Sequence, residues 1–407
     1  MTYNFLYIDP GTGSMLFSLF IGIATAGIFG IRTLYSKLRF IFSGGKVHDN
    51  DDANCIPYLI FSDHKRYWNI FKPICDEFES RKVSLVYYTA SPDDPALSEK
   101  YEYVKTEFIG EGNRAFARLN VVHADILIAT TPNLDVYQWK RSKYVRMYVH
   151  IPHYVGDLSD YRMFGLDYYD AVLITGPNQE RFIRQIETLR PSIKRKELYT
   201  TGSLVLDALK EKLEANGKFS PSGKKTVLVA PSWGKSGILS RYGEKLLAAL
   251  QKTGYEIIVR PHPQSVVSEK NILEPLEKKF SDFNWNYDNN NFDVLNKSDI
   301  LITDFSGIIF DYSLVFGKPV IYADTNFDKA PYDADWIEGK IWSLRAVEKI
   351  GVQLKESDFD RIKEVIDNAI NSDELQKARA EIISECWEKQ GESAVNTVDW
   401  LIEKRQK

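Results

Sequence analysis

The sequence predicts an α/β protein in which two domains are each built on a mainly parallel β-sheet. The chain has 407 residues, which is long enough for two domains of ordinary size. Short apolar runs alternate with stretches of helical periodicity, and this alternation is typical of parallel strands joined by helices. Hydrophobic residues make up 44% of the chain and the net charge is -4, so the composition does not favour nucleic acid as a partner.

A stretch without any charged residue occupies residues 14–31. Its length is close to the roughly 20 apolar residues that span a bilayer. Basic residues follow the stretch, whereas a cleaved signal peptide carries its positive charge first. We therefore expect a transmembrane helix over residues 14–36 and an extracytoplasmic segment over residues 1–13, with the rest of the chain on the cytoplasmic side of the inner membrane. A buried helix of a soluble domain is the alternative interpretation.

Small residues recur every four positions in this stretch, at Gly22, Ala26 and Gly30. This spacing can form a helix-pairing face, so we expect a homo-oligomer through the transmembrane helix. Small residues are also common in membrane helices for other reasons. Residues 37–54 follow as a basic and aromatic segment that ends in a linker. The three cysteines lie far apart without a metal-ligand pattern, which indicates a reducing compartment.

The remaining sequence predicts two domains separated by a short hinge. The first domain is expected over residues 55–210, where strand-like runs alternate with helical stretches. Those runs are Tyr58–Phe61, Val83–Tyr88, Ile126–Ala129, Arg146–Ile151 and Ala171–Ile174. A charged segment with Asn-Gly and Pro-Ser-Gly turns marks the hinge over residues 211–225. The second domain follows over residues 226–375, and amphipathic helices occupy residues 376–407.

Three predicted strands of the second domain end in turns whose side chains suit an anion. The groups are Ser232 and Lys235 after Val227–Ala230, Arg260 and His262 after Ile257–Val259, and Asp304, Ser306 and Gly307 after Ile300–Thr303. Ligands of open parallel sheets bind at the carboxyl ends of the strands. The third turn also opens a helix, whose free amides and dipole attract phosphate. The alternative is that Asp304 or Ser306 only caps that helix.

The segments APSWGKSG, VRPHP and SDILITDFSGIIFDY, in this order and spacing, resemble the C-terminal half of the CDP-glycerol glycerophosphotransferase family. This family builds teichoic-acid-type poly(polyol phosphate) chains. The resemblance covers about residues 226–322 and weakens toward the N-terminus. It implies a GT-B fold, in which two Rossmann-like domains face each other across a cleft. It also implies that the last helices cross back to the first domain.

The resemblance further implies the reaction and the roles of the domains. Glycerol phosphate, or another polyol phosphate, would pass from a CDP-activated donor on the second domain to a hydroxyl of a lipid-linked or polymeric acceptor on the first. CMP would leave, and neither a cofactor nor a metal would be required. The expected substrate-binding residues are Arg260, Ser232, Lys235, Asp304, Ser306, Gly307, Asp311 and His150. A solvent-facing helix carboxylate is nearly as good an interpretation of Asp311.

The two expected catalytic residues are His153 and His262. His262 would stabilise or protonate the leaving phosphate. A hydroxyl that attacks phosphorus needs a base that is neutral near pH 7, and histidine fits. Members of the family carry this base just after the matching strand in a Trp-His-Gly context, which this chain lacks, so either His150 or His153 can be the match. We favour His153 because His150 falls within the strand pattern and is expected to be buried. Both histidines being structural is the remaining alternative.

Two other functions are compatible with the same sequence. A GT-B glycosyltransferase or epimerase acting on a nucleotide sugar would have the same fold and a different donor. A membrane-tethered scaffold without catalysis would not need His153, His262 and Arg260 at the cleft.

Overall fold

The computed structural model describes residues 55–407, except 220–222, 289, 324–328, 330–333 and 338. By its internal contacts the chain divides into two units, Met1–Cys55 and Ile56–Lys407. The expected transmembrane helix over residues 14–36 lies outside the described residues, as do the flanking segments 1–13 and 37–54. Within the described ranges, no helix has the length and apolar character needed to cross a bilayer.

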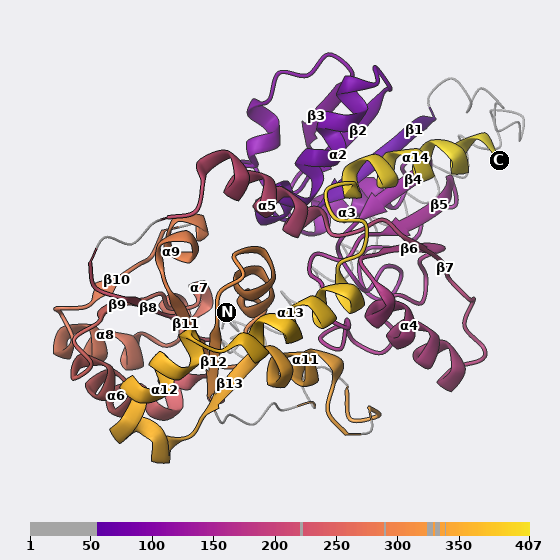
Figure 1. Ribbon diagram of the computed structural model, residues 1–407. Coiled ribbons are helices and arrows are strands. Elements are labelled where there is room, and N and C mark those ends of the chain that lie inside the picture. Colours follow the sequence, from indigo (N-terminus) through magenta and orange to yellow (C-terminus); the bar gives the residue numbers. More distant parts are fainter. Residues whose placement is uncertain (1–54, 220–222, 289, 324–328, 330–333, 338) are drawn as a thin grey trace, which may run out of the picture. The chain divides into compact units, whose positions relative to one another are not determined.

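The first sheet has seven parallel strands in the order β3-β2-β1-β4-β5-β6-β7 (Figure 1). The strands are β1 Ile56–Ser62, β2 Leu85–Thr89, β3 Val104–Phe108, β4 Ala124–Ala129, β5 Val145–His150, β6 Ala171–Ile174 and β7 Glu197–Thr200. The central strands β1 and β4 are largely buried, as their nearly continuous apolar sequences indicate. The helices that accompany this sheet are α2 Trp68–Ser80, α3 Asn113–Leu119, α4 Pro177–Leu189 and α5 Leu204–Asn216.

The second sheet has six parallel strands in the order β10-β9-β8-β11-β12-β13. The strands are β8 Thr226–Val229, β9 Glu256–Val259, β10 Asn284–Trp285, β11 Ile300–Thr303, β12 Val320–Ala323 and β13 Gly351–Leu354. Its helices are α6 Ile238–Gln251, α7 Pro263–Ser268, α8 Lys270–Lys279, α9 Phe292–Lys297, α10 Ile308–Phe310, α11 Trp342–Ile350, α12 Ile362–Ile370 and α13 Asp373–Cys386. Two parallel sheets with helical connections confirm the predicted α/β architecture.

Strand β11 lies between β8 and β12, with Ile302 paired to Val229 on one side and to Ile321 on the other. The turn after β11 therefore lies beside the turn after β8. Helix α10 has only three residues and continues as a π turn over Asp311–Val315. Gly317, with a φ of +67°, then ends the helical stretch, because glycine adopts this conformation without a steric penalty.

The last helix, α14 Ser393–Gln406, packs against α2 and also contacts α5 and β4. Trp400 is buried in the same apolar cluster as the inward-facing residues of β1. The preceding Trp387 donates its indole N–H to Asp207 of α5, at 2.8 Å. Helix α14 thus completes the core of the first sheet.

The loop after β5 contacts the start of α11 in the second sheet's domain. The buried carboxylate of Asp157 accepts hydrogen bonds from the backbone N–H of Trp342, at 2.6 Å, and from the hydroxyl of Ser343, at 2.8 Å. These bonds satisfy donors that a helix start otherwise leaves unpaired. They join the loop that carries His153 to the second sheet's domain.

Candidate active site

Asp304 connects two of the three predicted anion-binding turns of the second sheet. Its carboxylate is buried, with 2% of the residue exposed, and both of its oxygens accept the backbone N–H of Ser232, at 2.9 and 3.0 Å. It also accepts the backbone N–H of Ile238, at 2.9 Å, and of Phe305, at 2.8 Å. Because Ile238 begins α6, Asp304 caps that helix instead of α10. The carboxylate therefore fixes the turns after β8 and β11 relative to each other.

The turn after β11 leaves its backbone open to a ligand. Helix α10 begins at the exposed Gly307, and no side chain caps its start. Neither Asp304 nor Ser306 has the capping role in α10 that sequence reasoning offered as the alternative. The first amides of a helix lack intrahelical partners, so those next to Gly307 and the half-buried Ser306 can bind an anion. Lys235 in the neighbouring turn is exposed.

Arg260 and His262 follow β9. The guanidinium of Arg260 donates to the side chain of Asn286 and to the backbone carbonyl of Asp288, which holds it in place. His262 caps α7, and its Nδ1 accepts the N–H of Gln264 at 3.1 Å. In the neutral ring the proton must then sit on Nε2. His262 can thus donate a hydrogen bond from Nε2, as stabilisation of a leaving phosphate requires.

Burial lowers the pKa of His262. The carboxylates of Asp304 and Glu269 act in the opposite direction, because a nearby negative charge favours the protonated ring, and the guanidinium of Arg66 lowers the pKa further. Glu269 also accepts the backbone N–H of Gly234, at 3.0 Å. The turn after β8 is therefore held by Glu269 as well as by Asp304.

In the first domain, a tyrosine hydroxyl lies between the two candidate histidines. Tyr161 Oη is 3.1 Å from His150 Nε2 and 3.2 Å from His153 Nδ1. His150 is fully buried at the end of β5, so the structure does not place it where a substrate can reach it. His153 is half-buried and lines the cleft described below. Tyr161 orients the His153 ring by its contact with Nδ1.

Both rings are held neutral at pH 7. Burial, with a smaller contribution from His153, lowers the pKa of His150 to about 3. Burial, followed by the charge of Arg66, lowers the pKa of His153 to about 4. Both effects disfavour the imidazolium. A neutral His153 has the protonation state that a general base needs.

A cleft of about 1,120 Å³ contains His153 and Asp311. Helices α2 and α5 line it, together with residues 290–292 before and at the start of α9 and the exposed Arg66 after β1. Burial raises the pKa of Asp311 to about 7, so this carboxyl titrates near neutral pH. Of the predicted site residues, only these two line the cleft. The turns after β8 and β11 are joined through Asp304, and none of the predicted site residues in these turns or in the turn after β9 lines the cleft.

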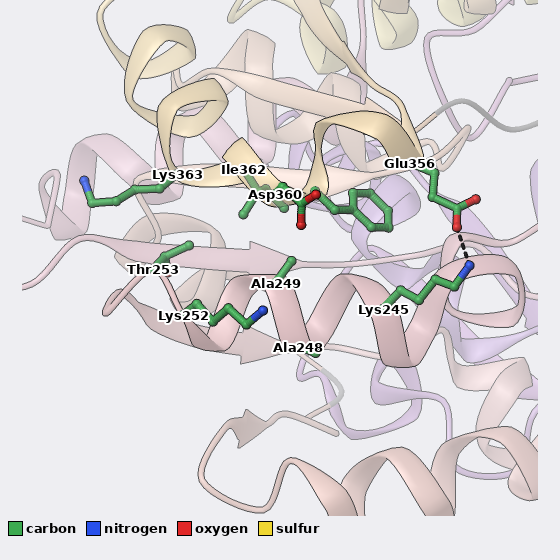
Figure 2. Close-up of a pocket in the computed structure, with 10 residues that line it drawn as sticks. Lys245, Ala248, Ala249, Lys252, Thr253, Glu356, Asp360, Ile362 and Lys363 are labelled. Carbon is green, nitrogen blue, oxygen red and sulfur yellow. Dashed lines mark hydrogen bonds and ion pairs between the residues drawn. The ribbon is translucent and has the colours of Figure 1, made fainter.

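A second cavity, of about 390 Å³, lies between α6 and the segment that leads into α12 (Figure 2). An ion pair between Lys245 and Glu356 crosses one end of it. None of the predicted site residues lines this cavity. It is distinct from the candidate active site.

Sequence reasoning missed three residues of this arrangement, namely Arg66, Tyr161 and Glu269. Arg66 follows the end of a predicted strand by a few residues, so the rule that ligands bind at strand ends could have found it. Tyr161 lies in an irregular loop, and Glu269 lies between two short helices. Neither position carries a local pattern that indicates its contacts.

The candidate site combines two parallel sheets with histidines and phosphate-suited turns at the strand ends, where open parallel sheets bind ligands. Residues 180–342 match the family model described as CDP-Glycerol:Poly(glycerophosphate) glycerophosphotransferase. The match covers 163 of the 407 residues.

Individual proteins are similar to this chain in sequence or in fold. Over 126 residues the chain is 29% identical to the minor teichoic acid biosynthesis protein GgaB of Bacillus subtilis (strain 168), a match that covers 25% of this chain and only 13% of that relative. The wall teichoic acid polymerase TagF superimposes with a TM-score of 0.56 at 13% identity, covering 93% of this chain and 98% of the other. A UDP-GlcNAc 2-epimerase from Neisseria meningitidis gives 0.54 at 15% identity, covering 86% and 100%. The structural matches show a shared GT-B-like fold.

Proposed function

We propose that the protein transfers glycerol phosphate, or another polyol phosphate, from a CDP-activated donor to a hydroxyl of a lipid-linked or polymeric acceptor. The observation that carries this proposal is the family match over residues 180–342, which includes the turns after β8, β9 and β11. A solved TagF structure with CDPG, at a TM-score of 0.57, supports a CDP-linked donor. The product would extend a cell-surface polymer.

In the proposed reaction, the acceptor hydroxyl attacks the donor phosphorus that carries the polyol. His153 takes the hydroxyl proton, the new P–O bond forms, and the P–O bond to CMP breaks. His262 donates from Nε2 to the departing CMP oxygen. Arg260 and the amides beside Gly307 neutralise the phosphate charge, and positioning with charge stabilisation supplies most of the acceleration in phosphoryl transfer. We propose that these groups act without a metal.

Release of CMP tests this function. Membranes containing the full chain are expected to release CMP from CDP-glycerol or CDP-ribitol, with or without EDTA, and not to turn over UDP-N-acetylglucosamine. His262→Ala should reduce release by about 100-fold, because it removes a stabilising donor in the transition state. Full activity in His262→Ala would contradict the mechanism, and inhibition by EDTA would contradict the metal-free reaction.

A second candidate function is catalysis on a nucleotide sugar. Solved epimerases with UDP-linked ligands share the fold, and one from Methanocaldococcus jannaschii gives a TM-score of 0.53. Turnover of the UDP-sugar instead of the CDP-polyol would establish this alternative. Turnover of no donor at all would favour a non-catalytic scaffold.

We also propose that residues 14–36 anchor the protein in the inner membrane, with residues 56–407 in the cytoplasm. The uncharged stretch and the basic residues after it support this proposal. The full chain is expected to stay in the membrane pellet after carbonate extraction, and a variant that starts at Cys55 is expected to be released. Release of the full chain by carbonate would contradict a spanning helix.

A further inference from the structure

Arg66 lies at the carboxyl edge of the first sheet, where its backbone is fixed. Strand β1 ends at Ser62, and a 3-10 turn over Lys65–Tyr67 follows. His64 caps this turn, since its Nδ1 accepts the N–H of Arg66 at 3.1 Å. Ligands bind at this edge of parallel sheets. The turn therefore presents Arg66 at a position suited to substrate contact.

Aromatic contacts orient the Arg66 side chain beside His153. The guanidinium carbon of Arg66 lies over the Tyr67 ring, 5.0 Å from its centre. The Tyr67 ring meets the His153 ring edge-on, with ring centres 5.5 Å apart. Arg66, Tyr67 and His153 all line the 1,120 Å³ cleft. The guanidinium thus sits close to the predicted base and within the cleft.

The positive charge of Arg66 is not neutralised by an ion pair with any described residue. Its neighbour Lys65 pairs with Asp93, and Arg81 farther along the chain pairs with Glu77 and Asp399. Among the described residues, no carboxylate lies within ion-pair distance of Arg66. Burial raises the pKa of the nearby Asp63, whereas the charge of Arg66 acts to lower it. An exposed arginine without a carboxylate partner is available to an anionic ligand.

The charge of Arg66 acts on both predicted catalytic residues. It lowers the pKa of His153 in the first domain and of His262 in the second. Coulomb interactions of this kind decay over several ångströms in a partly solvated site. The positive charge of Arg66 therefore acts at both histidines of the proposed reaction, in addition to its place in the cleft lining with His153.

We propose that Arg66 binds a phosphate oxyanion of the substrate and so supplies, from the first domain, a cation to a phosphate site formed mainly by the second. The proposal rests on the proposed function. The phosphate comes either from the donor diphosphate or from a phosphodiester of the acceptor. Arginine suits this task because its planar fork binds two phosphate oxygens at once.

The test compares two neighbouring residues of the same turn in the full chain. Arg66→Gln removes the cleft cation, and Lys65→Gln removes an exposed cation that is already paired with Asp93 outside the cleft lining. Calorimetry measures binding of inorganic pyrophosphate and of CDP-glycerol, the latter in a His153→Gln background so that the donor is not consumed. Steady-state assays measure the KM of the acceptor.

Arg66→Gln is expected to weaken one of these interactions by about 10-fold or more, the typical effect of a lost hydrogen bond to a charged group. Weaker CDP-glycerol binding assigns the phosphate to the donor, whereas a raised acceptor KM with unchanged donor binding assigns it to the acceptor. Arg66→Lys should retain part of the wild-type binding, because lysine keeps the positive charge. Equal values for Arg66→Gln and Lys65→Gln in every measurement would overturn the proposal.

A failure of the Arg66 proposal can be distinguished from a failure of the proposed transferase function. If the wild-type chain does not turn over CDP-glycerol, the transferase assignment fails. Pyrophosphate binding requires no turnover, so it still reports whether Arg66 holds phosphate. Pyrophosphate affinity that is the same in Arg66→Gln and Lys65→Gln in such a protein would overturn the Arg66 site as well.

Discussion

Replacing His153 with glutamine is expected to lower kcat for CMP release from CDP-glycerol by about 1,000-fold, within the range that a general base contributes. Glutamine has a similar length and can still bond to the hydroxyl of Tyr161, so the loop should keep its fold. It cannot accept the proton of the attacking hydroxyl. The KM for the donor should change little, because the donor turns lie in the other sheet.

His123→Gln is the matched control. His123 lies just before β4 and stacks on the Tyr144 ring, with ring centres 3.9 Å apart. It does not line the cleft. This variant should keep wild-type kcat, and a His153→Gln enzyme as active as His123→Gln would exclude His153 as the base.

The pH dependence of kcat/KM provides a second measurement on His153. The charged and titratable groups that surround its ring are Arg66, Tyr67, His150, Tyr154 and Tyr161. A base works in its neutral form, so activity is present above its pKa and is lost as pH falls through about 4. An acidic limb near pH 6.5, the ordinary value for histidine, would show that burial and Arg66 do not set the protonation of the base.

Asp304→Asn is expected to lower the free energy of unfolding by about 3 kcal/mol, measured by urea denaturation. The carboxylate accepts N–H groups with both oxygens. An amide has one oxygen and one NH₂ group. In one of the turns, a backbone N–H would therefore point at the NH₂ group of the new asparagine, and neither group could accept a hydrogen bond. A buried donor left without a partner costs about 1–3 kcal/mol, and bonds to a charged group are stronger than neutral ones.

Asp299→Asn is the control for this change. Asp299 lies at the other end of β11 and accepts a single side-chain bond, from the backbone N–H of Thr226 at 2.8 Å. Loss of this hydrogen bond should lower the free energy of unfolding by about 1 kcal/mol. If the two variants unfold at the same urea concentration, Asp304 does not hold the donor turns together.

The buried strands of both sheets could be predicted from the sequence, and the edge strands could not. Strands β4 and β11 read as continuous apolar runs, because both faces are covered. The outer strands β3 and β7 have the sequences VKTEF and ELYT, and they are partly exposed. Their polar residues conceal the strand pattern, because an edge strand needs little apolar surface.

The candidate site divides in the same way. The turns after β8, β9 and β11 follow strands that the sequence reveals, so their side chains could be assigned to one edge of a sheet. The contacts of Tyr161 depend on the path of an irregular loop, which no periodicity specifies. The hydrogen bond that the backbone N–H of Ser232 donates to the Asp304 carboxylate was also not predictable, because it requires the pairing of strands that are about 70 residues apart.

The packing of α14 against α2 and the first sheet has a consequence for folding during synthesis. Val398, Trp400 and Leu401 belong to the same buried cluster as residues of β1 and α2, and more than 300 residues separate these segments in the sequence. Domains generally fold as the chain emerges from the ribosome. Here the strands of the first sheet are synthesised early. Helix α14, which buries part of their apolar surface, is synthesised only after the entire second sheet. The second domain can therefore reach its native state before the first does.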